Sequence, residues 1–465
     1  MNTQPDSPNL LKNINTLAEL RSAALEQHQA GNLGDAKELY RLYLQRAPQD
    51  AMFWSNLGAL FRSEKKYEVA AACQRRALQL NDNSVSVINN AANALYDVGD
   101  AKEALALRRR ALKMEPGKAE NYATLAKYLR GLGRHAEAEA ELKKALRAHP
   151  NDPELHIQLS FAELSQGKYP EGFKSFHWRW KGDEISPPEF DFPQWQGEDL
   201  NGKTIMIIPE QGFGDTILMA RFFKPLKALG CRVKFACKPP LRRLFAQLPG
   251  VDVFAEGHEA LADCDYWAPM MDLPRFLGTT IETVPAPALL SIPEDSMTRA
   301  RHITEPFDKM FKLGVLWSGS VTYRANHKRS FNHSSFLKLA DIPGLQMFSL
   351  YKGPLVEEYH ADGTSCVIFD AASSDRDFAD SAALIAELDL VVTMDSAIAH
   401  VAGSLGGPVW DLLHSEAYWL YEPFDDHTPW YPNMRLVRQR EAGNWDAVFD
   451  QLHSEISELV KEKLG

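Results

Sequence analysis

Three segments between residues 209 and 403 of the 465-residue chain carry residue types that could act on an anionic ligand. The first follows a short apolar run and reads Pro-Glu-Gln-Gly-Phe-Gly-Asp-Thr over 209–216. Gly212 and Gly214 let the backbone approach a ligand closely, and the N–H groups of such a turn can receive an anion or a sugar hydroxyl. Asp215 comes directly after them, where its carboxylate could serve as a general base. The alternative is that Asp215 only caps a helix expected over 216–229.

The second segment is an apolar run over 313–317 that ends in Trp317, Ser318 and Gly319. Lys328 and Arg329 follow it a few residues later. Small residues at the end of a strand, followed by cations, suit an anionic ligand. Scattered surface cations are the alternative interpretation.

The third segment runs from 390 to 403 and joins a buried strand to a helix rich in small side chains. The strand ends at Asp395, and the helix begins directly afterwards. The free N–H groups near Ser396 and Ala397 carry the positive end of the helix dipole and can bind a phosphate. Asp395 is also a good N-cap residue, and His400 could be an ordinary core histidine; these are the alternatives.

Short apolar runs that alternate with helical segments must position these loops. The runs are expected strands at 204–208, 233–236, 313–317, 347–350, 367–369, 390–394 and 409–413. Strands separated by amphipathic helices predict parallel α/β layers, and a proline-rich gap at 284–293 divides them into two domains. Ligands bind beyond the carboxyl ends of such strands, so we expect a cleft between the domains.

The first half of the chain is a 34-residue repeat. Small residues recur at that interval: Ala36, Ala70, Ala104, Ala138 and Gly172. The phase gives five units that start at Leu17, Ala51, Val85, Ala119 and Pro153. This pattern resembles the tetratricopeptide repeat, a helix–turn–helix unit whose copies stack into a superhelix with a concave groove.

Polar side chains on the first helices are expected to line that groove: Asn56, Asn89, Asn90, Asn93, Thr124, Lys127 and Gln158. Amide groups both donate and accept, so they could hold the backbone of an extended peptide. The alternative is a merely solvated inner face. The cations at 108–110 lie on a second helix, and we interpret them as part of a solvated outer face.

The second half resembles the heptosyltransferase-like group of nucleotide-sugar glycosyltransferases, in the bacterial branch that carries tetratricopeptide repeats. The matching pieces are the segments at 210–216, 317–319 with 329–330, 395–403, 407–410 and 430–435. The resemblance implies a GT-B fold of two Rossmann-like domains with the donor bound between them. Relatives usually differ at Gly407 and over 411–415.

The resemblance also implies roles. Asp215 would deprotonate the acceptor hydroxyl, and Asp395, Ser396 and His400 would lie against the donor diphosphate and sugar. Lys328 or Arg329 would neutralise phosphate. Asp263-Cys264-Asp265 fits the DxD pattern of metal-dependent transferases, but we interpret it as a coincidence and expect no metal, because helix dipoles and cations can stabilise the leaving phosphate.

The expected fold class is therefore α plus α/β: a tetratricopeptide α-solenoid followed by a GT-B fold. The expected parts are a tail at 1–16, five repeat units at 17–180, a connector at 181–202, an acceptor-side domain at 203–290 and a donor domain at 300–465. A net charge of −11 argues against a nucleic-acid partner. No apolar run is long enough to cross a membrane, and no apolar signal-peptide core opens the chain, so we expect a cytoplasmic protein.

The leading functional hypothesis is a metal-independent protein glycosyltransferase. It would move a sugar from a nucleotide-sugar co-substrate to Ser or Thr of a protein held by the repeats, with no other cofactor. Enzymes of this layout include those that glycosylate flagellin, which suggests flagellin as the acceptor and a CMP-nonulosonate as the donor. The alternatives are a transferase that builds lipopolysaccharide or another glycan, and a non-catalytic adaptor with a decayed transferase half.

Overall fold

The computed structural model describes residues 14–182, 188–256, 261, 263–323, 326–422, 424–441 and 443–465. Most of the expected tail, and 183–187 of the expected connector, lie outside these residues. The chain divides into two compact units, Met1–Leu159 and Ser160–Gly465. The division falls inside helix α10 (Pro153–Leu164). No helix of the described residues combines the length and the apolar character needed to cross a membrane.

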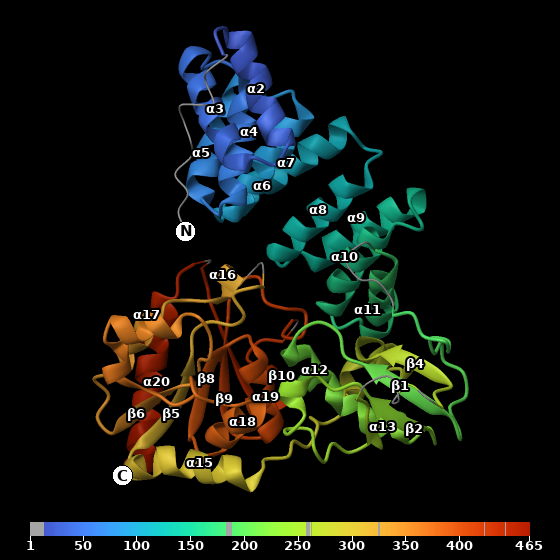
Figure 1. The fold of residues 1–465 in the computed structure, drawn as a ribbon, viewed down its shortest axis with the longest axis vertical. Helices are drawn as coiled ribbons and strands as arrows, with labels where there is room; N and C mark the ends of the chain where they lie inside the picture. The colour runs from blue at the N-terminus through green and yellow to red at the C-terminus, as the bar shows by residue number, and fades with distance from the viewer. Residues whose placement is uncertain are drawn as a thin grey trace. The chain divides into compact units, whose positions relative to one another are not determined.

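The first unit is built from paired helices (Figure 1). Its complete helices are α2 (Leu17–Gln29), α3 (Leu33–Arg46), α4 (Ala51–Ser63), α5 (Tyr67–Leu80), α6 (Val85–Asp97), α7 (Ala101–Met114), α8 (Ala119–Gly131) and α9 (His135–Ala148). The first helix of every pair, α10 included, begins where the 34-residue phase starts a unit. The small residues of that phase on α3, α5, α7 and α9 are all fully buried, so the two helices of a pair can lie close together.

The turns inside the pairs explain why glycine recurs with the same period. Gly31, Gly99, Gly133 and Gly167 all have φ between +69° and +84°, a conformation that costs other residues energy. In the second pair the equivalent residue is Lys65, which adopts the same left-handed conformation with φ +61°. The turn geometry is therefore set by the repeat even where the sequence offers no glycine.

The second unit contains two sheets. The smaller one is fully parallel, with the order β3-β2-β1-β4. Its strands are β1 (Thr204–Ile208), β2 (Arg232–Phe235), β3 (Val253–Phe254) and β4 (Tyr266–Pro269). This sheet carries the first of the three loops at the carboxyl end of β1.

The larger sheet has the order β10-β11-β9-β8-β5-β6-β7 and is parallel except for β10. Its strands are β5 (Phe311–Leu316), β6 (Leu345–Ser349), β7 (Ile368–Asp370), β8 (Leu390–Met394), β9 (Val409–Leu413), β10 (His427–Thr428) and β11 (Tyr431–Arg438). The central strands β5, β8 and β9 are buried throughout, as near-continuous apolar runs predict. The second and third loops follow β5 and β8. An array of helical repeats followed by parallel α/β sheets confirms the expected fold class.

The helices of this unit are α11 (Tyr169–Phe176), α12 (Phe213–Met219), α13 (Phe223–Lys227), α14 (Leu273–Phe276), α15 (Glu294–Thr304), α16 (Asn326–Arg329), α17 (Val356–Ala361), α18 (Phe378–Ala386), α19 (Ala397–Leu405) and α20 (Asp446–Leu464). The single helix expected over 216–229 is wrong: α12 starts at Phe213, and a 3₁₀ turn at Ala220–Phe222 separates it from α13. Helix α11 packs within the core of the second unit, where Trp430 Nε1 donates to the Tyr169 hydroxyl at 2.8 Å.

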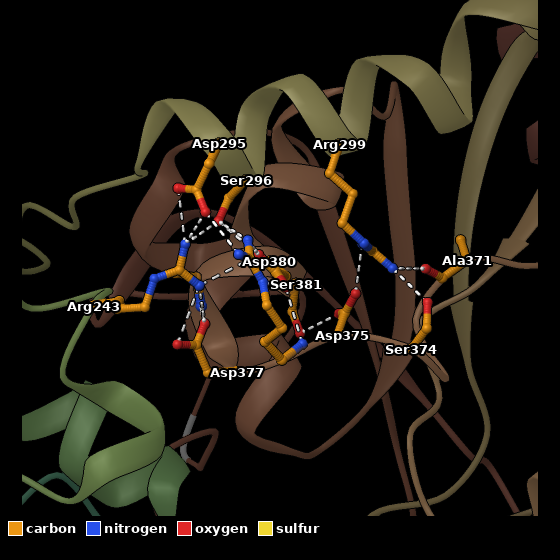
Figure 2. A network of polar contacts seen from close by, with 12 residues as sticks. Arg243, Asp295, Ser296, Arg299, Ala371, Ser374, Asp375, Asp377, Asp380 and Ser381 are labelled. Carbon is orange, nitrogen blue, oxygen red and sulfur yellow. Dashed lines mark hydrogen bonds and ion pairs between the residues drawn. The ribbon is translucent and has the colours of Figure 1, made fainter.

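A polar network connects the part of the unit that contains the smaller sheet to helices α15 and α18, which belong to the part that contains the larger sheet (Figure 2). Arg243 follows β2, and its guanidinium lies 2.8 Å from Asp295 of α15 and 3.1 Å from Asp377, the N-cap of α18. Ser296 of α15 donates to Asp380 of α18 at 2.6 Å. These contacts hold the two layers against each other.

Candidate active site

Asp215 lies in the first turn of α12, and its carboxylate helps to start that helix. Gly212 is the N-cap residue, and its N–H donates to Asp215 Oδ2 at 2.9 Å. The preceding residue, Gln211, has φ +57°, and the Lys238 ammonium donates to its carbonyl oxygen. The expected alternative, Asp215 as an N-cap, is therefore wrong in position: Asp215 is the third residue of the helix and accepts from the cap.

The surroundings of Asp215 change its affinity for a proton. Burial and the charge of Asp395 raise the pKa of Asp215, the hydrogen bond from Gly212 lowers it, and the net result is a pKa of about 6. A carboxylate with a pKa near the working pH is suited to general base catalysis. The environment thus gives Asp215 a property that a helix-capping residue does not need.

Helix α12 touches helix α19 directly beside Asp215. A Cβ added to Gly214 would lie 2.7 Å from His400 Cδ2 and 3.4 Å from Ala397 Cα. The second glycine of the loop is therefore required for close approach of the two helices. This contact brings together the first and third segments, which are separated by about 180 residues in the sequence.

The N-cap of α19 is Ser396, whose hydroxyl accepts from the N–H of Ile398 at 3.2 Å. The expectation that Asp395 caps this helix is therefore wrong. Asp395 is instead held by other partners: the Tyr421 hydroxyl donates to its Oδ1 at 3.2 Å, and Arg329 Nη1 lies 3.6 Å from its Oδ2. Its carboxylate is partly buried at the start of α19, where the free N–H groups of the first turn lie.

His400 is buried on the face of α19 that meets α12. Its Nδ1 lies 3.1 Å from the Tyr431 hydroxyl. Burial lowers the pKa of His400 to about 4, so the imidazole is neutral at physiological pH. It can still offer a hydrogen bond, but it adds no positive charge for a phosphate.

The second segment forms a tightly bonded loop at the end of β5. Trp317 is 1% exposed and packs against Tyr351 with ring centroids 5.0 Å apart, so it supports the loop from the core. The Ser318 hydroxyl accepts from Asn326 Nδ2 at 3.0 Å. A Cβ on Gly319 would lie 3.0 Å from Arg329 Nη2, so this glycine leaves room for the guanidinium. Direct contact of these residues with a donor stays a prediction.

The two candidate cations both have acidic partners. Lys328 Nζ donates to both Glu416 oxygens at 2.8 and 3.0 Å. Arg329 faces Asp395 and also lies over the Tyr323 ring, 4.5 Å from its centroid. Of the two, Arg329 is the one in contact with the start of α19, so it is the better candidate for a phosphate ligand.

Four residues of this site carried no signal that singled them out in the sequence. Tyr418 and Tyr421 follow β9; burial raises the pKa of both hydroxyls well above the usual range, and Asp395 raises them further. Arg221 is buried beside α12 and donates to the Trp430 carbonyl at 2.7 Å. Tyr323 is half exposed above Arg329. Isolated tyrosines and a lone arginine could be found only from the fold.

Glu210 begins the glycine-rich loop but belongs to a different network. It accepts from Arg179 Nε at 2.9 Å, and Arg179 also donates to Asp272 at 2.7 Å. All three residues are buried. This network joins the turn after α11 to the carboxyl end of β1, and it holds the loop in place rather than facing a ligand.

The expected groove residues lie in the first unit and are half buried, except Lys127, which is exposed. Six of them already make hydrogen bonds inside the unit: Asn56 with Tyr40, Asn90 with Ser55, Asn89 and Asn93 with Arg108, Thr124 with Glu120, and Gln158 with Arg130 and Glu154. Peptide binding by this set stays a prediction.

Arg108 corrects the expectation of a solvated cationic face. It is 3% exposed, and it donates to the side-chain oxygens of Asn89 at 2.6 Å and Asn93 at 2.9 Å. Arg109 and Arg110 do lie on the surface, paired with Glu137 and Asp82. Because Arg108 occupies the oxygens of two groove amides, it leaves their N–H groups to donate.

Comparison with known proteins supports the repeats. Residues 22–85 and 95–159 each match a family described as tetratricopeptide repeat. "Protein FlbA" of Caulobacter vibrioides is 26% identical over 342 residues, which cover 66% of this chain and 56% of FlbA. The chain thus spans little more than half the length of that curated relative.

Solved structures resemble about a third of the chain. A crystal structure of MamA protein matches with a TM-score of 0.33 and 16% identity, covering 37% of this chain and 98% of MamA. YrrB, described as a TPR protein with an unusual peptide-binding site, matches with a TM-score of 0.33 and 13% identity, covering 38% of this chain and 92% of YrrB. On the family matches, this chain is a protein that contains tetratricopeptide repeats.

Proposed function

We propose that the chain is a glycosyltransferase that moves a sugar from a nucleotide-sugar donor to Ser or Thr of a protein acceptor held by the repeats. The observation that carries the proposal is the contact between α12 and α19. It sets Asp215, with a pKa of about 6, beside the first turn of a helix that offers free N–H groups, with Arg329 next to it. A base and an anion site in one place are what transfer from a sugar phosphate requires.

In the proposed reaction, the acceptor hydroxyl oxygen attacks the anomeric carbon of the sugar, and its proton passes to the Asp215 carboxylate. The bond between the anomeric carbon and the phosphate oxygen breaks, and its electron pair leaves with the nucleotide. The N–H groups at the start of α19 and the Arg329 guanidinium stabilise the charge that develops on that phosphate. His400 is neutral and provides a hydrogen bond rather than charge.

The acceptor is proposed to be a protein because tetratricopeptide repeats bind peptides in a groove. For the specific pair we propose flagellin and a CMP-activated nonulosonic acid, on the resemblance to glycosyltransferases of this layout. The reaction takes place in the cytoplasm in this proposal. No observation favours the lipopolysaccharide alternative.

A non-catalytic adaptor is the second candidate, and one observation favours it. Lys328 and Arg329, the cations expected to hold phosphate, already face Glu416 and Asp395. A donor would have to compete with those carboxylates. If the protein is a non-catalytic adaptor, the second unit binds no nucleotide sugar.

Calorimetry of the full chain with CMP-, UDP-, GDP-, ADP- and dTDP-linked sugars separates the two candidates. An enzyme binds at least one donor, and the intact mass of co-expressed flagellin then rises by one or more sugar residues. Absence of binding across the panel would reject the enzyme. Donor binding without a mass increase would reject flagellin as the acceptor.

The role of the groove is tested on the full chain with Lys127→Glu. This change reverses an exposed charge on α8, the first helix of its pair. Lys144→Glu, which changes another exposed lysine on α9, the second helix of the same pair, is the matched control. We expect the first variant to raise the KM for the protein acceptor without changing donor affinity. Equal behaviour of the two variants would remove the groove from acceptor binding.

A further inference from the structure

His400 is buried where α19 lies beside α12 (Figure 1), and its two ring nitrogens have different surroundings. Nδ1 lies 3.1 Å from the Tyr431 hydroxyl, which is hydrogen-bond distance. Nε2 lies on the α12 side, 3.3 Å from the position of a Cβ built on Gly214. Among the residues that the structure describes, Nε2 has no hydrogen-bond partner. It is therefore the polar atom of His400 that is left for a ligand.

Tyr431 is held in place from several sides. It opens β11 and is 0% exposed. Its ring packs on α19 where Gly403 has no side chain, since a Cβ there would lie 2.6 Å from Tyr431 Cδ1. The Arg221 guanidinium lies over the same ring, 4.7 Å from its centroid, and donates to the Trp430 carbonyl at 2.7 Å. The hydroxyl of Tyr431 is thus kept beside His400.

The direction of this hydrogen bond follows from what a buried hydroxyl needs. A buried O–H without an acceptor is costly, whereas a buried oxygen tolerates an unused lone pair better. Within the described part of the chain, His400 Nδ1 is the only acceptor at hydrogen-bond distance from the Tyr431 hydroxyl. Arg221 has no acceptor atom, and the Ser404 hydroxyl meets hydrogen-bond geometry with no described residue. The Tyr431 hydroxyl therefore donates, and Nδ1 accepts.

An accepting Nδ1 determines where the imidazole carries its proton. Burial lowers the pKa of His400 to about 4, so the ring is neutral at physiological pH and has a single N–H. If Nδ1 accepts from Tyr431, that N–H is on Nε2. The nitrogen that has no partner in the protein is then a hydrogen-bond donor.

We propose that Tyr431 is a positioning residue: its hydroxyl donates to Nδ1 of His400 and keeps the imidazole proton on Nε2, from which it donates to an oxygen of the bound nucleotide sugar. A nucleotide sugar presents phosphate and hydroxyl oxygens, which can accept from a neutral N–H. This contact with the nucleotide sugar rests on the proposed function. The tautomer does not, because it concerns only groups of this protein.

The first test determines the tautomer without any nucleotide sugar. Long-range ¹H–¹⁵N correlation spectra at neutral pH are recorded on the full chain labelled with ¹⁵N-histidine, and His400→Gln identifies the His400 signals by their loss. We expect Nδ1 to have the chemical shift of an unprotonated nitrogen and Nε2 that of a protonated one. Tyr431→Phe keeps the ring but removes the hydroxyl, so the two shifts should move toward each other as the proton divides between the nitrogens. A proton on Nδ1 in the wild type, or unchanged signals in Tyr431→Phe, would overturn the proposal.

The second test asks which nitrogen faces the nucleotide sugar, by calorimetry with whichever compound of the panel binds. Gln places an amide N–H near the position of Nε2, whereas the shorter Asn places it near Nδ1. His400→Gln should therefore keep the Kd within about threefold, and His400→Asn should raise it about tenfold, the size expected for one hydrogen bond. Equal losses in the two variants would refute the contact through Nε2.

The role of Tyr431 is tested by combining the changes. Tyr431→Phe should raise the Kd of the wild type about threefold, because only a fraction of the protein then carries the proton on Nε2. The same change should leave the Kd of His400→Gln unchanged, because Gln has no tautomer to fix. An equal effect in both backgrounds would contradict the proposal and leave Tyr431 only a packing role.

Two outcomes need a second measurement. If the His400 variants fail to fold, the ¹⁵N spectra of Tyr431→Phe decide, because His400 is the described histidine whose ring is hydrogen-bonded to Tyr431. If no nucleotide sugar binds the wild type, the proposed function fails, while the spectra still decide on the tautomer.

Discussion

Replacing Asp215 by Asn should make the protein less active and, at neutral pH, more stable. The change is nearly isosteric, and the Asn oxygen can still accept from the Gly212 N–H that now lies 2.9 Å from Oδ2. The start of α12 is therefore preserved. What is lost is the base, so turnover with saturating donor and acceptor should fall roughly 10²–10⁴-fold.

The gain in stability follows from the raised pKa of Asp215. The folded state raises that pKa from the ordinary 3.8 to about 6, so folding favours the protonated carboxyl. Below pH 4 Asp215 is protonated in both the folded and the unfolded state, so the pKa shift does not change the free energy of unfolding. As the pH rises from about 4 to about 6, the wild type loses stability, and above pH 6 the loss is at most about 3 kcal/mol, since one pKa unit corresponds to about 1.4 kcal/mol. Asn does not titrate and escapes this loss.

Unfolding by urea, followed by tryptophan fluorescence at several pH values, measures the difference. All tryptophans except Trp54 belong to Ser160–Gly465, so the signal reports the unit that holds Asp215. Between pH 4 and pH 6 the free energy of unfolding of the variant should increase relative to that of the wild type. Above pH 6 the difference should stay constant. In the wild type the rate at subsaturating substrate should rise with pH through about 6. Full turnover in the variant would reject the base, and parallel stability curves would reject the raised pKa.

Three further outcomes are expected. Lys65→Gly should stabilise the repeats by about 0.5–1 kcal/mol in urea unfolding followed by far-UV circular dichroism, because glycine relieves the left-handed turn; a loss of stability would refute this. Gly214→Ala should lower kcat/KM at least about tenfold, because the added Cβ would meet His400. Gly407→Ala, whose Cβ would meet nothing within 4 Å, should leave kcat/KM unchanged. Equal effects of the two changes would show that the contact between α12 and α19 is not needed for activity. Arg329→Ala should raise the donor Kd at least about tenfold by calorimetry and shift Tm by only a few degrees; an unchanged Kd would make it a surface cation.

The repeat could be predicted almost to the residue because one pattern fixes both ends of every helix pair. The same phase also indicates that Arg108 is buried. Arg108 stands at the position held by Tyr40, Gln74 and Leu142 in the other units, and all four are buried. Its charge suggested an outer face, but its place in the repeat meant burial, and the neighbouring amides satisfy the guanidinium.

Local sequence could not decide the ends of the helices at the site. Asp395 and Ser396 are adjacent and both are good caps, so only the observed geometry assigns the cap to Ser396. Strand β11 was missed because Pro432 and Asn433 within it are residues typical of turns. Tyr421 reaches Asp395 from a loop, and no periodicity of the sequence describes such a contact.

The contact between α12 and α19 makes the candidate base and the candidate donor site one electrostatic unit. The charge of Asp395 already raises the pKa of Asp215. A donor phosphate at the start of α19 would add negative charge on the same side, and by the same reasoning would raise that pKa further. Asp215 would then hold a proton more strongly in the donor complex than in the free protein. The base would thus be strengthened at the step in which the acceptor hydroxyl gives up its proton, and the missing side chain of Gly214 is what lets the two helices lie close enough for this coupling.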